Sequence, residues 1–292
     1  MTVALRATEV AEALESATGA LSAAGCDTPR LDAEVLLAHV LGSDRTRLLA
    51  DVRAPLPESA VRPYQDAVRR RAIEREPVAY ITGRRGFRHL EVAVDRRVLI
   101  PRPETELLVE VGLELAPGAS VLDVGTGSGA VALALKHERP DLVVSASDRS
   151  ADALAVARAN GARLGLEVEW LEGDLLAPAL GHRFDAVLAN PPYVAEAELP
   201  ELAPEIVRHE PAAALRGGPD GLSVIRALVE QGAAARMPML ALEVGAGQAP
   251  AVDRLLRTAG FGRVQRRRDL AGVERVVVGS RPGPGTGRGR DR

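Results

Sequence analysis

The spacing of hydrophobic residues changes twice along the chain and divides it into three parts. Over residues 1–75 the apolar positions recur at the three- and four-residue intervals that are typical of amphipathic helices. Helices are predicted over residues 8–24, 29–41, 45–51 and 58–74. Because such helices bury their apolar faces against one another, this part is predicted to form a small helical bundle.

Residues 76–103 have a different pattern. Val78–Thr82 and Leu90–Val94 have the composition of strands, and the glycine-containing turn 83–86 lies between them. Leu99–Pro103 is predicted to be rigid and extended, because each proline fixes its own φ and disfavours helix at the preceding residue. This segment is therefore predicted to be a β-hairpin linker between two domains.

From residue 104 to residue 279, short apolar strands alternate with helices. The strands are predicted over 120–124, 143–147, 168–171, 184–189, 239–244, 262–266 and 274–278, and the helices over 104–116, 130–138, 151–164, 222–235 and 252–259. Buried strands that alternate with helices predict an α/β domain with a doubly wound, mostly parallel sheet. The segment 280–292 is rich in Gly, Pro and Arg, and it is expected to be a disordered tail.

Composition excludes several classes of protein. The 37 Lys and Arg residues against 40 Asp and Glu residues give a net charge of −3, which argues against a protein that coats nucleic acid. The single cysteine, Cys26, excludes an internal disulfide and a cysteine-rich zinc site, and the five dispersed histidines predict no metal centre. No apolar run approaches the ~20 residues that span a bilayer, and the N-terminus contains acids, unlike a signal peptide. We expect a reduced, cytoplasmic protein.

A glycine-rich loop, Asp123-Val124-Gly125-Thr126-Gly127-Ser128-Gly129, joins the first strand of the α/β domain to a helix. Glycines let the backbone approach a ligand, and the helix N-terminus offers free N–H groups. With Ala130 the loop also matches the dinucleotide pattern Gly-x-Gly-x-x-Gly/Ala. Asp123 would repel a pyrophosphate, whereas it suits a ligand with an ammonium and a sulfonium group, such as S-adenosylmethionine. The alternative is that Asp123 only caps a backbone turn.

Two further carboxylates follow the next two strands. Asp148, at the end of the second strand, can accept both hydroxyls of a ribose, which NAD and S-adenosylmethionine share. Asp174, after the third strand, can accept from an adenine amino group, or it can serve as the N-cap of a loop. These residues predict a nucleoside site but do not identify the nucleoside.

The most specific motif is Asn190-Pro191-Pro192-Tyr193, directly after the strand 184–189. Ligands of open α/β sheets bind beyond the carboxyl ends of the strands, so the motif is predicted to lie at the site. The side-chain carbonyl of Asn190 and the main-chain carbonyl of Pro191 offer two acceptors for a planar NH₂ group, and Tyr193 offers a flat wall. Such a pair would hold the nitrogen in line with a methyl donor, so catalysis by orientation and desolvation needs no nucleophilic side chain.

These motifs closely resemble the family of bacterial peptide chain release factor glutamine N5-methyltransferases. The resemblance covers nearly the whole chain and includes, besides the two motifs above, Leu31–Glu34, Leu36–His39, Pro77–Gly83, Phe87, Leu99–Glu106, His209–Pro211, Ala214-Leu215, Asp269–Gly272 and Glu274-Arg275. The glycine loop is common to S-adenosylmethionine enzymes, and Asn-Pro-Pro-Tyr is shared with amino-methylating DNA enzymes. The proline-flanked Arg102 segment is what distinguishes this family.

The resemblance implies a helical bundle, a hairpin linker and a seven-stranded, Rossmann-like methyltransferase domain. Because the bundle over residues 1–75 carries no catalytic motif of its own, we interpret it as a docking surface for the protein substrate. It implies that S-adenosylmethionine is the cofactor and that the substrate is the glutamine in the Gly-Gly-Gln motif of class 1 release factors. The implied cofactor contacts are Gly125, Thr126, Gly127, Ser128, Gly129, Asp148, Asp174, Leu175 and Asn190. The implied glutamine pocket, which includes the catalytic Asn190, Pro191 and Tyr193, consists of Asn190, Pro191, Pro192 and Tyr193. Where some members have a tryptophan, Leu175 offers only apolar contact to the adenine.

Two other functions fit part of the pattern. An adenine-N6 methyltransferase of nucleic acid would use the same acceptor pair, but it needs a basic recognition surface and a flipped base. The net charge of −3 and the absence of a sizeable insert within residues 180–240 argue against it. The other alternative is a nucleotide-binding module that regulates a partner through its helical part. We expect a monomer that binds neither membrane nor nucleic acid.

Overall fold

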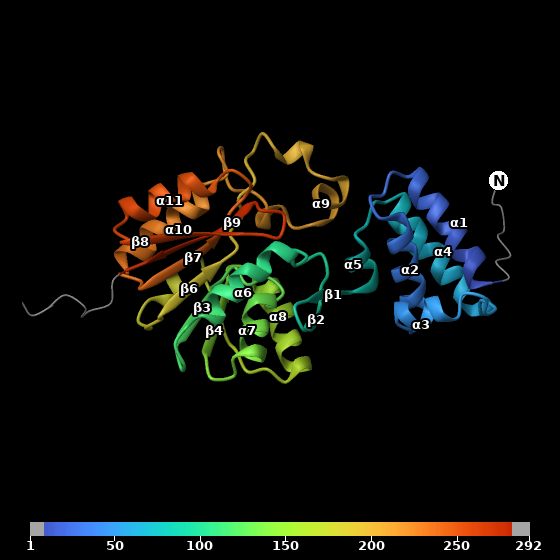
Figure 1. Ribbon diagram of the computed structural model, residues 1–292, viewed down its shortest axis with the longest axis horizontal. Coiled ribbons are helices and arrows are strands. Elements are labelled where there is room, and N and C mark those ends of the chain that lie inside the picture. The colour runs from blue at the N-terminus through green and yellow to red at the C-terminus, as the bar shows by residue number, and fades with distance from the viewer. Residues whose placement is uncertain (1–8, 282–292) are drawn as a thin grey trace, which may run out of the picture. The chain divides into compact units, whose positions relative to one another are not determined.

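The computed structural model describes residues 9–281, and these form two compact units (Figure 1). The helical unit comprises residues 9–84 together with 203–209, and the α/β unit comprises residues 85–202 and 210–281. Residues 203–209 thus belong to the helical unit although they lie within the α/β part of the sequence. In the described residues no helix is both long and apolar enough to cross a bilayer.

The helical unit confirms the four predicted helices, with small shifts of their ends. Its helices are α1 (Val10–Ala23), α2 (Pro29–Val40), α3 (Arg45–Ala50), α4 (Glu58–Ala72), α5 (Val78–Thr82) and α9 (Pro204–His209). The apolar faces of α1 and α2 meet through the fully buried side chains Leu14, Leu21, Leu36 and Leu37. Helix α2 begins with a proline at its first position, where the missing N–H costs no hydrogen bond.

Buried ion pairs attach α9 to this bundle. Arg71 donates from Nε to Asp32 Oδ2 and from Nη1 to Glu205 Oε1, both at 2.7 Å, and Arg75 also pairs with Glu205. Helix α9 ends at His209, whose Nε2 lies 2.8 Å from the carbonyl oxygen of Glu74. The pattern of apolar residues did not predict α9, because these pairs join positions more than 130 residues apart.

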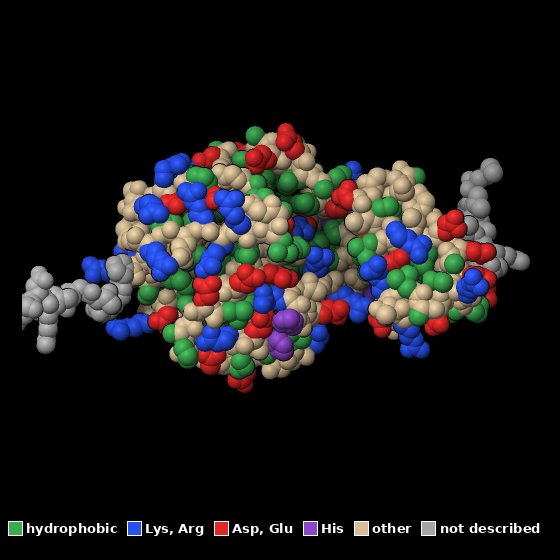
Figure 2. All heavy atoms as spheres, in the orientation of Figure 1, with side chains coloured by type: hydrophobic (Ala, Val, Ile, Leu, Met, Phe, Trp, Pro, Cys, Tyr) green, Lys and Arg blue, Asp and Glu red, His purple; other side chains and the backbone are tan. Residues whose placement is uncertain are grey.

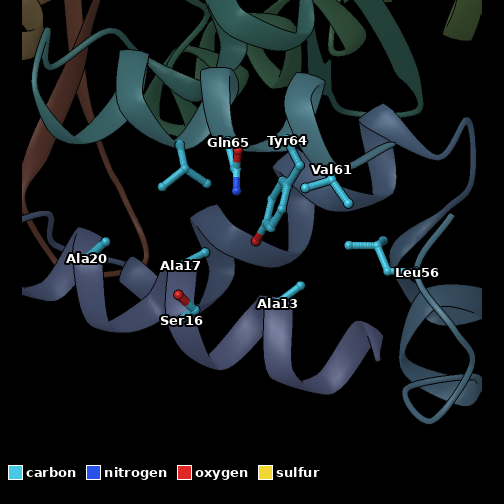
Figure 3. A pocket seen from close by; sticks show the side chains of 9 residues that line it. Ala13, Ser16, Ala17, Ala20, Leu56, Val61, Tyr64 and Gln65 are labelled. Carbon is cyan, nitrogen blue, oxygen red and sulfur yellow. The ribbon is translucent and has the colours of Figure 1, made fainter. Parts of the chain in front are cut away.

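A small apolar pocket of about 130 Å³ lies between α1 and α4 (Figure 3). The ring of Tyr64 extends from α4 into this space, and its hydroxyl donates to the carbonyl oxygen of Ala33 at 3.1 Å. The lining residues are Ala13, Ser16, Ala17, Ala20, Leu56, Val61, Tyr64, Gln65 and Val68. The hydroxyl of Tyr64 thus has a hydrogen-bond partner, and the rest of the pocket presents mainly aliphatic surface.

The predicted strand over Val78–Thr82 is wrong, because these residues form helix α5. Pro77 precedes the helix, Gly83 ends it in the left-handed conformation, and the Thr82 hydroxyl donates back to the carbonyl oxygen of Val78. These end signals outweigh the β-branched composition of so short a segment. The hairpin instead pairs β1 (Arg84–Phe87) with β2 (Leu90–Ala93), and the prediction for the second strand is confirmed.

The α/β unit confirms the predicted seven-stranded, doubly wound sheet, whose strand order is β5-β4-β3-β6-β7-β9-β8. Neighbouring strands from β5 to β7 pair in parallel, whereas β9 is antiparallel to both β7 and β8. The strands are β3 (Ser120–Val124), β4 (Val143–Asp148), β5 (Glu169–Glu172), β6 (Ala186–Ala189), β7 (Met239–Glu243), β8 (Arg263–Arg268) and β9 (Glu274–Ser280). The strand order reverses between β3 and β6, which is where ligands of such sheets bind.

Helices cover both faces of this sheet (Figure 1). One face carries α6 (Glu106–Leu113), α7 (Ala130–Glu138) and α8 (Ala151–Leu164), and the other carries α10 (Ser223–Ala234) and α11 (Ala249–Thr258). Short 3₁₀ turns are η1 (Pro103–Thr105), η2 (Ala177–Ala179), η3 (Leu199–Glu201) and η4 (Ala212–Ala214). Strand β9 extends to Ser280, one residue past the predicted domain end, and the predicted disordered tail otherwise lies outside the described residues, apart from Arg281.

Candidate active site

A cavity of about 420 Å³ opens at the carboxyl edge of the sheet, where the loops after β3, β4, β5 and β6 meet. Residues of the extended segment 97–105 and of the segment 211–228 complete its wall. The residues predicted from the sequence that line it are Gly125, Thr126, Gly127, Ser128, Asp148, Asp174, Leu175, Asn190, Pro191 and Pro192. Two predicted site residues, Gly129 and Tyr193, lie outside this lining.

The first half of the glycine loop is open toward the cavity. The backbone N–H groups of Gly125 and Thr126 both donate to the carbonyl oxygen of Ser147, at 2.8 and 2.9 Å, so the loop is fixed against the end of β4. Gly125 and Gly127 have φ of +72° and +57°, and a Cβ at either position would meet nothing within 4 Å. The chain therefore leaves space for a ligand to touch this backbone.

Gly129 has a different role from the other two glycines of the loop. It precedes α7 with φ of +83°, and a Cβ there would lie 3.1 Å from side-chain atoms of Leu133 and Trp170 and 3.2 Å from Ala157. Its close neighbours are protein atoms of α7, α8 and β5. We interpret Gly129 as the residue that lets these elements pack closely, because only a hydrogen fits between them.

Asp123, within β3, is buried and lines the cavity. The hydroxyl of Thr126 donates to its Oδ2 at 2.6 Å, and the backbone N–H of Ala132 donates to the same carboxyl. Burial raises the pKa of Asp123 to about 6, and the nearby charge of Asp148 acts in the same direction, while the two hydrogen bonds oppose it. The carboxyl thus both secures the loop and faces a cavity in which a cation would be favoured.

Asp148 and the segment after β5 form the next part of the wall. Asp148 Oδ2 accepts from the backbone N–H of Gly127 at 3.0 Å, and Oδ1 accepts from that of Ser150 at 2.9 Å. Asp174 is exposed, and its carbonyl oxygen accepts from Ala177 at the start of η2. Leu175 has a positive φ of 50°, which is unfavourable for a residue with a Cβ, and the turn places it in the lining.

Asn190 follows β6 and projects from the edge at which β3 and β6 pair. Its Nδ2 donates to the hydroxyl of Thr105 at 3.1 Å, which leaves the amide oxygen as the free arm of the side chain. The backbone after the motif is tightly packed, since a Cβ at Gly221 would lie 2.3 Å from the carbonyl oxygen of Tyr193. Gln248 also donates to that oxygen at 2.9 Å. The end of the motif is therefore held by contacts with Gly221 and Gln248, and Asn190 reaches the cavity from a fixed backbone.

Tyr193, the last residue of the motif, lies outside the cavity lining. Its ring packs against the core, its hydroxyl donates to Glu243 Oε1 at 3.4 Å, and burial raises its pKa to about 12. Glu243, the last residue of β7, is only 1% exposed. The flat wall predicted from Tyr193 stays a prediction, and the structure gives its hydroxyl a partner that the sequence analysis did not identify.

Sequence reasoning missed several polar residues of this edge. Arg102 and Thr105 line the cavity, and the guanidinium of Arg102 pairs with the buried carboxylate of Glu210 at 2.5 Å. Glu210 Oε2 also accepts from the backbone N–H of Ile100. The sequence could have predicted Glu243 as a site residue, because it ends an apolar strand of the sheet, as Asp148 does. For Arg102 and Thr105 the sequence offered only their position in the proline-rich segment. Because tertiary contacts place that segment beside the sheet, the sequence pattern alone did not assign them to the site.

The cavity fits a nucleoside cofactor with a positive charge. A volume of about 420 Å³ lies in the usual range of small-molecule sites. Open glycine backbone, the carboxylate of Asp148 for a diol and the buried carboxyl of Asp123 for a cation are all present in one lining. Within residues 9–281 no group of three His, Cys, Asp or Glu side chains could hold a metal ion.

Comparison with known proteins agrees with this geometry. Residues 12–83 match the model of the PrmC N-terminal domain, and residues 103–230 match that of the methyltransferase small domain. The hMettl16 catalytic domain, solved in complex with the MAT2A 3′UTR hairpin 6, has a TM-score of 0.55 over 76% of this chain and 81% of its own, at 14% identity. A methyltransferase from Pyrococcus furiosus has a TM-score of 0.51 over 65% and 88%, at 16% identity. These two similarities establish the fold only.

Two curated relatives are much closer in sequence. The release factor glutamine methyltransferase of Moorella thermoacetica is 44% identical over 278 residues, which cover 92% of this chain and 98% of the relative. That of Deinococcus radiodurans is 42% identical over 280 residues, which cover 94% and 99%. Identity of this level over both the helical and the α/β part shows that the chain belongs to the release factor glutamine methyltransferase family.

Proposed function

We propose that this chain transfers the methyl group of S-adenosylmethionine to the side-chain amide nitrogen of the glutamine in the Gly-Gly-Gln motif of class 1 release factors. One observation carries the proposal: Asn190, Pro191 and Pro192 line the same cavity as Gly125–Ser128. An acceptor motif for an NH₂ group and a cofactor loop therefore share one chamber. Family membership supports the choice of glutamine over other amides.

The residues of the cofactor half have distinct roles in this proposal. When bound, S-adenosylmethionine supplies an electrophilic methyl group on a sulfonium. Asp148 accepts hydrogen bonds from the ribose hydroxyls, and Asp123 offers the negative charge that favours a cationic ligand. Leu175 provides apolar contact for the adenine, and Asp174 lies beside it. The open backbone of Gly125–Ser128 lets the ligand approach closely.

Asn190 and Pro191 act on the substrate. The side-chain oxygen of Asn190 and the main-chain oxygen of Pro191 accept the two N–H groups of the glutamine amide and hold its nitrogen toward the methyl group. Accepting both N–H bonds also raises the electron density on the amide nitrogen, and one of its two N–H protons is lost to solvent when the methyl group is transferred. Pro192 limits the motion of the motif, and Tyr193 anchors its last position through core packing and a hydrogen bond to Glu243. The rate gain comes from orientation and exclusion of water, so no nucleophilic side chain of the chain is needed.

The helical unit is proposed to dock the protein substrate, since it contains no comparable set of cavity-lining acids. We propose that the chain acts in the cytoplasm as a monomer and does not use nucleic acid as its substrate. On the visible face, acidic and basic side chains are mixed over the helical unit, whereas basic side chains predominate near β8 and α11 of the α/β unit (Figure 2). The net charge of −3 supports recognition of a protein over recognition of a phosphate backbone.

Mass spectrometry of a recombinant class 1 release factor tests the function directly. After incubation with the chain and S-adenosylmethionine, we expect a gain of one CH₂ group on the glutamine of Gly-Gly-Gln and no gain when that glutamine is replaced. Asn190→Ala should lower kcat by about 10²-fold, because one oriented hydrogen-bonding partner of the reacting group is lost. Methylation of adenine in DNA or RNA, with none on the release factor, would establish the alternative function instead.

A further inference from the structure

The carboxyl of Glu243 lies beneath the Asn190–Tyr193 motif and is not used in the mechanism above. Glu243 is 1% exposed, and its Oε2 is buried with no hydrogen-bond partner among residues 9–281. The hydroxyl of Tyr193 donates to Oε1 at 3.4 Å, and the hydroxyl of Thr105 lies near enough to the carboxyl to favour its ionised form and lower its pKa. A buried acid without a paired cation lowers the stability of the fold. The role of Glu243 is therefore expected to lie in the function of the site.

Thr105 connects this carboxyl to the proposed catalytic amide. Its oxygen receives a hydrogen bond from Nδ2 of Asn190 at 3.1 Å. A threonine hydroxyl has a single proton, and an ionised carboxylate can only accept. The proton of Thr105 is therefore committed to Glu243, and the oxygen of Thr105 is left to accept from Asn190. The negative charge of Glu243 thus sets which atom donates and which accepts, both between Thr105 and Glu243 and between Asn190 and Thr105.

We propose that Glu243 is a positioning residue for methyl transfer, which acts through Thr105 to present the side-chain oxygen of Asn190, and not its nitrogen, to the substrate amide. If Asn190 were flipped, its oxygen and Glu243 would compete for the one proton of Thr105, and a donor would face the NH₂ group of the substrate. This inference rests on the proposed function, because the need for an acceptor comes from that NH₂ group.

Protonation of Glu243 should release this constraint. Burial, the largest effect, and the nearby charge of Glu104 raise the pKa of Glu243 to about 7, while the hydroxyls of Thr105 and Tyr193 and the charge of Arg275 oppose the rise. A protonated carboxyl can donate, so Thr105 can then turn its own proton toward Asn190. With saturating cofactor, we expect kcat to fall as the pH decreases through about 7.

The test compares variants by kcat on a Gly-Gly-Gln peptide and by thermal stability. Glu243→Gln keeps the shape of the side chain, removes the obligate acceptor and should lower kcat by about tenfold. Because it also removes a buried acid, it should leave Tm unchanged or raise it. Thr105→Val should give a similar loss, Thr105→Ser should restore most of the activity, and the double variant should lose no more than either single one. Glu172→Gln, at the exposed end of β5, is the control with unchanged kcat.

The pH profile separates positioning from a merely structural role. The wild type should show the fall in kcat toward low pH, and Glu243→Gln should have a flat profile over the same range. A Glu243→Gln variant with wild-type kcat, or with a parallel loss of Tm and cofactor affinity, would overturn the proposal. Equal activities of Thr105→Val and Thr105→Ser would overturn it as well. If the wild type methylates neither the peptide nor the whole release factor, the proposed function is wrong. That result is distinct from the failure of the positioning role, which only the variants report.

Discussion

Two glycines of the same loop should respond differently to alanine. Gly127 and Gly129 both have positive φ, so a Cβ costs about 1–2 kcal/mol at either position through the left-handed conformation. At Gly127 the Cβ meets nothing within 4 Å and enters the cavity lining. At Gly129 it lies 3.1 Å from Leu133 and Trp170, and such overpacking adds about 1–3 kcal/mol. Gly129→Ala should therefore destabilise the α/β unit by about 2–5 kcal/mol, and Gly127→Ala only by the smaller conformational cost.

The expected changes in Tm and in binding run in opposite order. For a unit of this size, each kcal/mol shifts Tm by roughly 2–4 °C, so Gly129→Ala should melt about 4–20 °C below the wild type and Gly127→Ala about 2–8 °C below it. For S-adenosylmethionine, Gly127→Ala should lose about tenfold or more in affinity, because its methyl group takes ligand space. Gly129→Ala, measured below its Tm, should bind within about threefold of the wild type.

The chain itself supplies the probe for this measurement. Trp170 is the single tryptophan of the sequence, and it lies in β5 of the α/β unit, so its fluorescence follows the unfolding of that unit alone. Calorimetric titration gives the affinities. Equal melting temperatures for the two variants would refute the packing role assigned to Gly129. Wild-type affinity in Gly127→Ala would refute the placement of the cofactor against this loop.

Three further outcomes follow from the same reasoning. Arg71→Met should destabilise the helical unit by about 3 kcal/mol in chemical denaturation, because it leaves the buried carboxylate of Asp32 without its cation and that of Glu205 with Arg75 alone, whereas Arg69→Met, which removes only exposed pairs, should change nothing measurable. Burial holds the pKa of Asp123 at about 6, above the usual 3.8 of an aspartate, so the unliganded fold loses stability as the pH rises between these two values. Because a bound cation favours the ionised carboxylate, cofactor binding near pH 6 should release a proton and become tighter as the pH rises, and Asp123→Asn should abolish both effects in calorimetry. If the helical unit docks the substrate, kinetic assays should give whole release factor a KM at least about tenfold below that of the free peptide.

Strong local signals made much of the α/β unit predictable. Strand β3 and helices α7 and α8 have the bounds that the apolar runs and their glycine or serine ends predict. Asp148 and Asn190 each follow or end a parallel strand, so the shared carboxyl edge of the sheet brings both into one cavity. Here the periodicity, the end signals and the topology all point to the same arrangement.

The parts that were missed depend on contacts between distant positions. Val78–Thr82 is an exception, because it has the composition of a strand and the adjacent residues Pro77 and Gly83, which are local signals, decide for a helix. Helix α9 has no strong periodicity, and it joins the helical unit through the pairing of Glu205 with Arg71. Gly127 and Gly129 look alike in the sequence, yet one faces open space and the other faces Trp170. Such differences arise only when the tertiary neighbours are in place.

The acids at the carboxyl edge of the sheet connect these observations. Asp123 in β3 and Glu243 at the end of β7 are both buried, and burial raises the pKa of each, to about 6 and about 7. Among residues 9–281, neither carboxyl has a basic side chain as a hydrogen-bond partner, and the hydroxyls of Thr126 and Tyr193 donate to them instead. A hydroxyl donor fixes the orientation of a carboxylate but does not neutralise its charge. Both acids therefore keep a negative potential that favours a cation nearby. An edge of this kind favours a cationic cofactor on one side and rigidly oriented acceptors on the other, and methyl transfer to an amide nitrogen needs both.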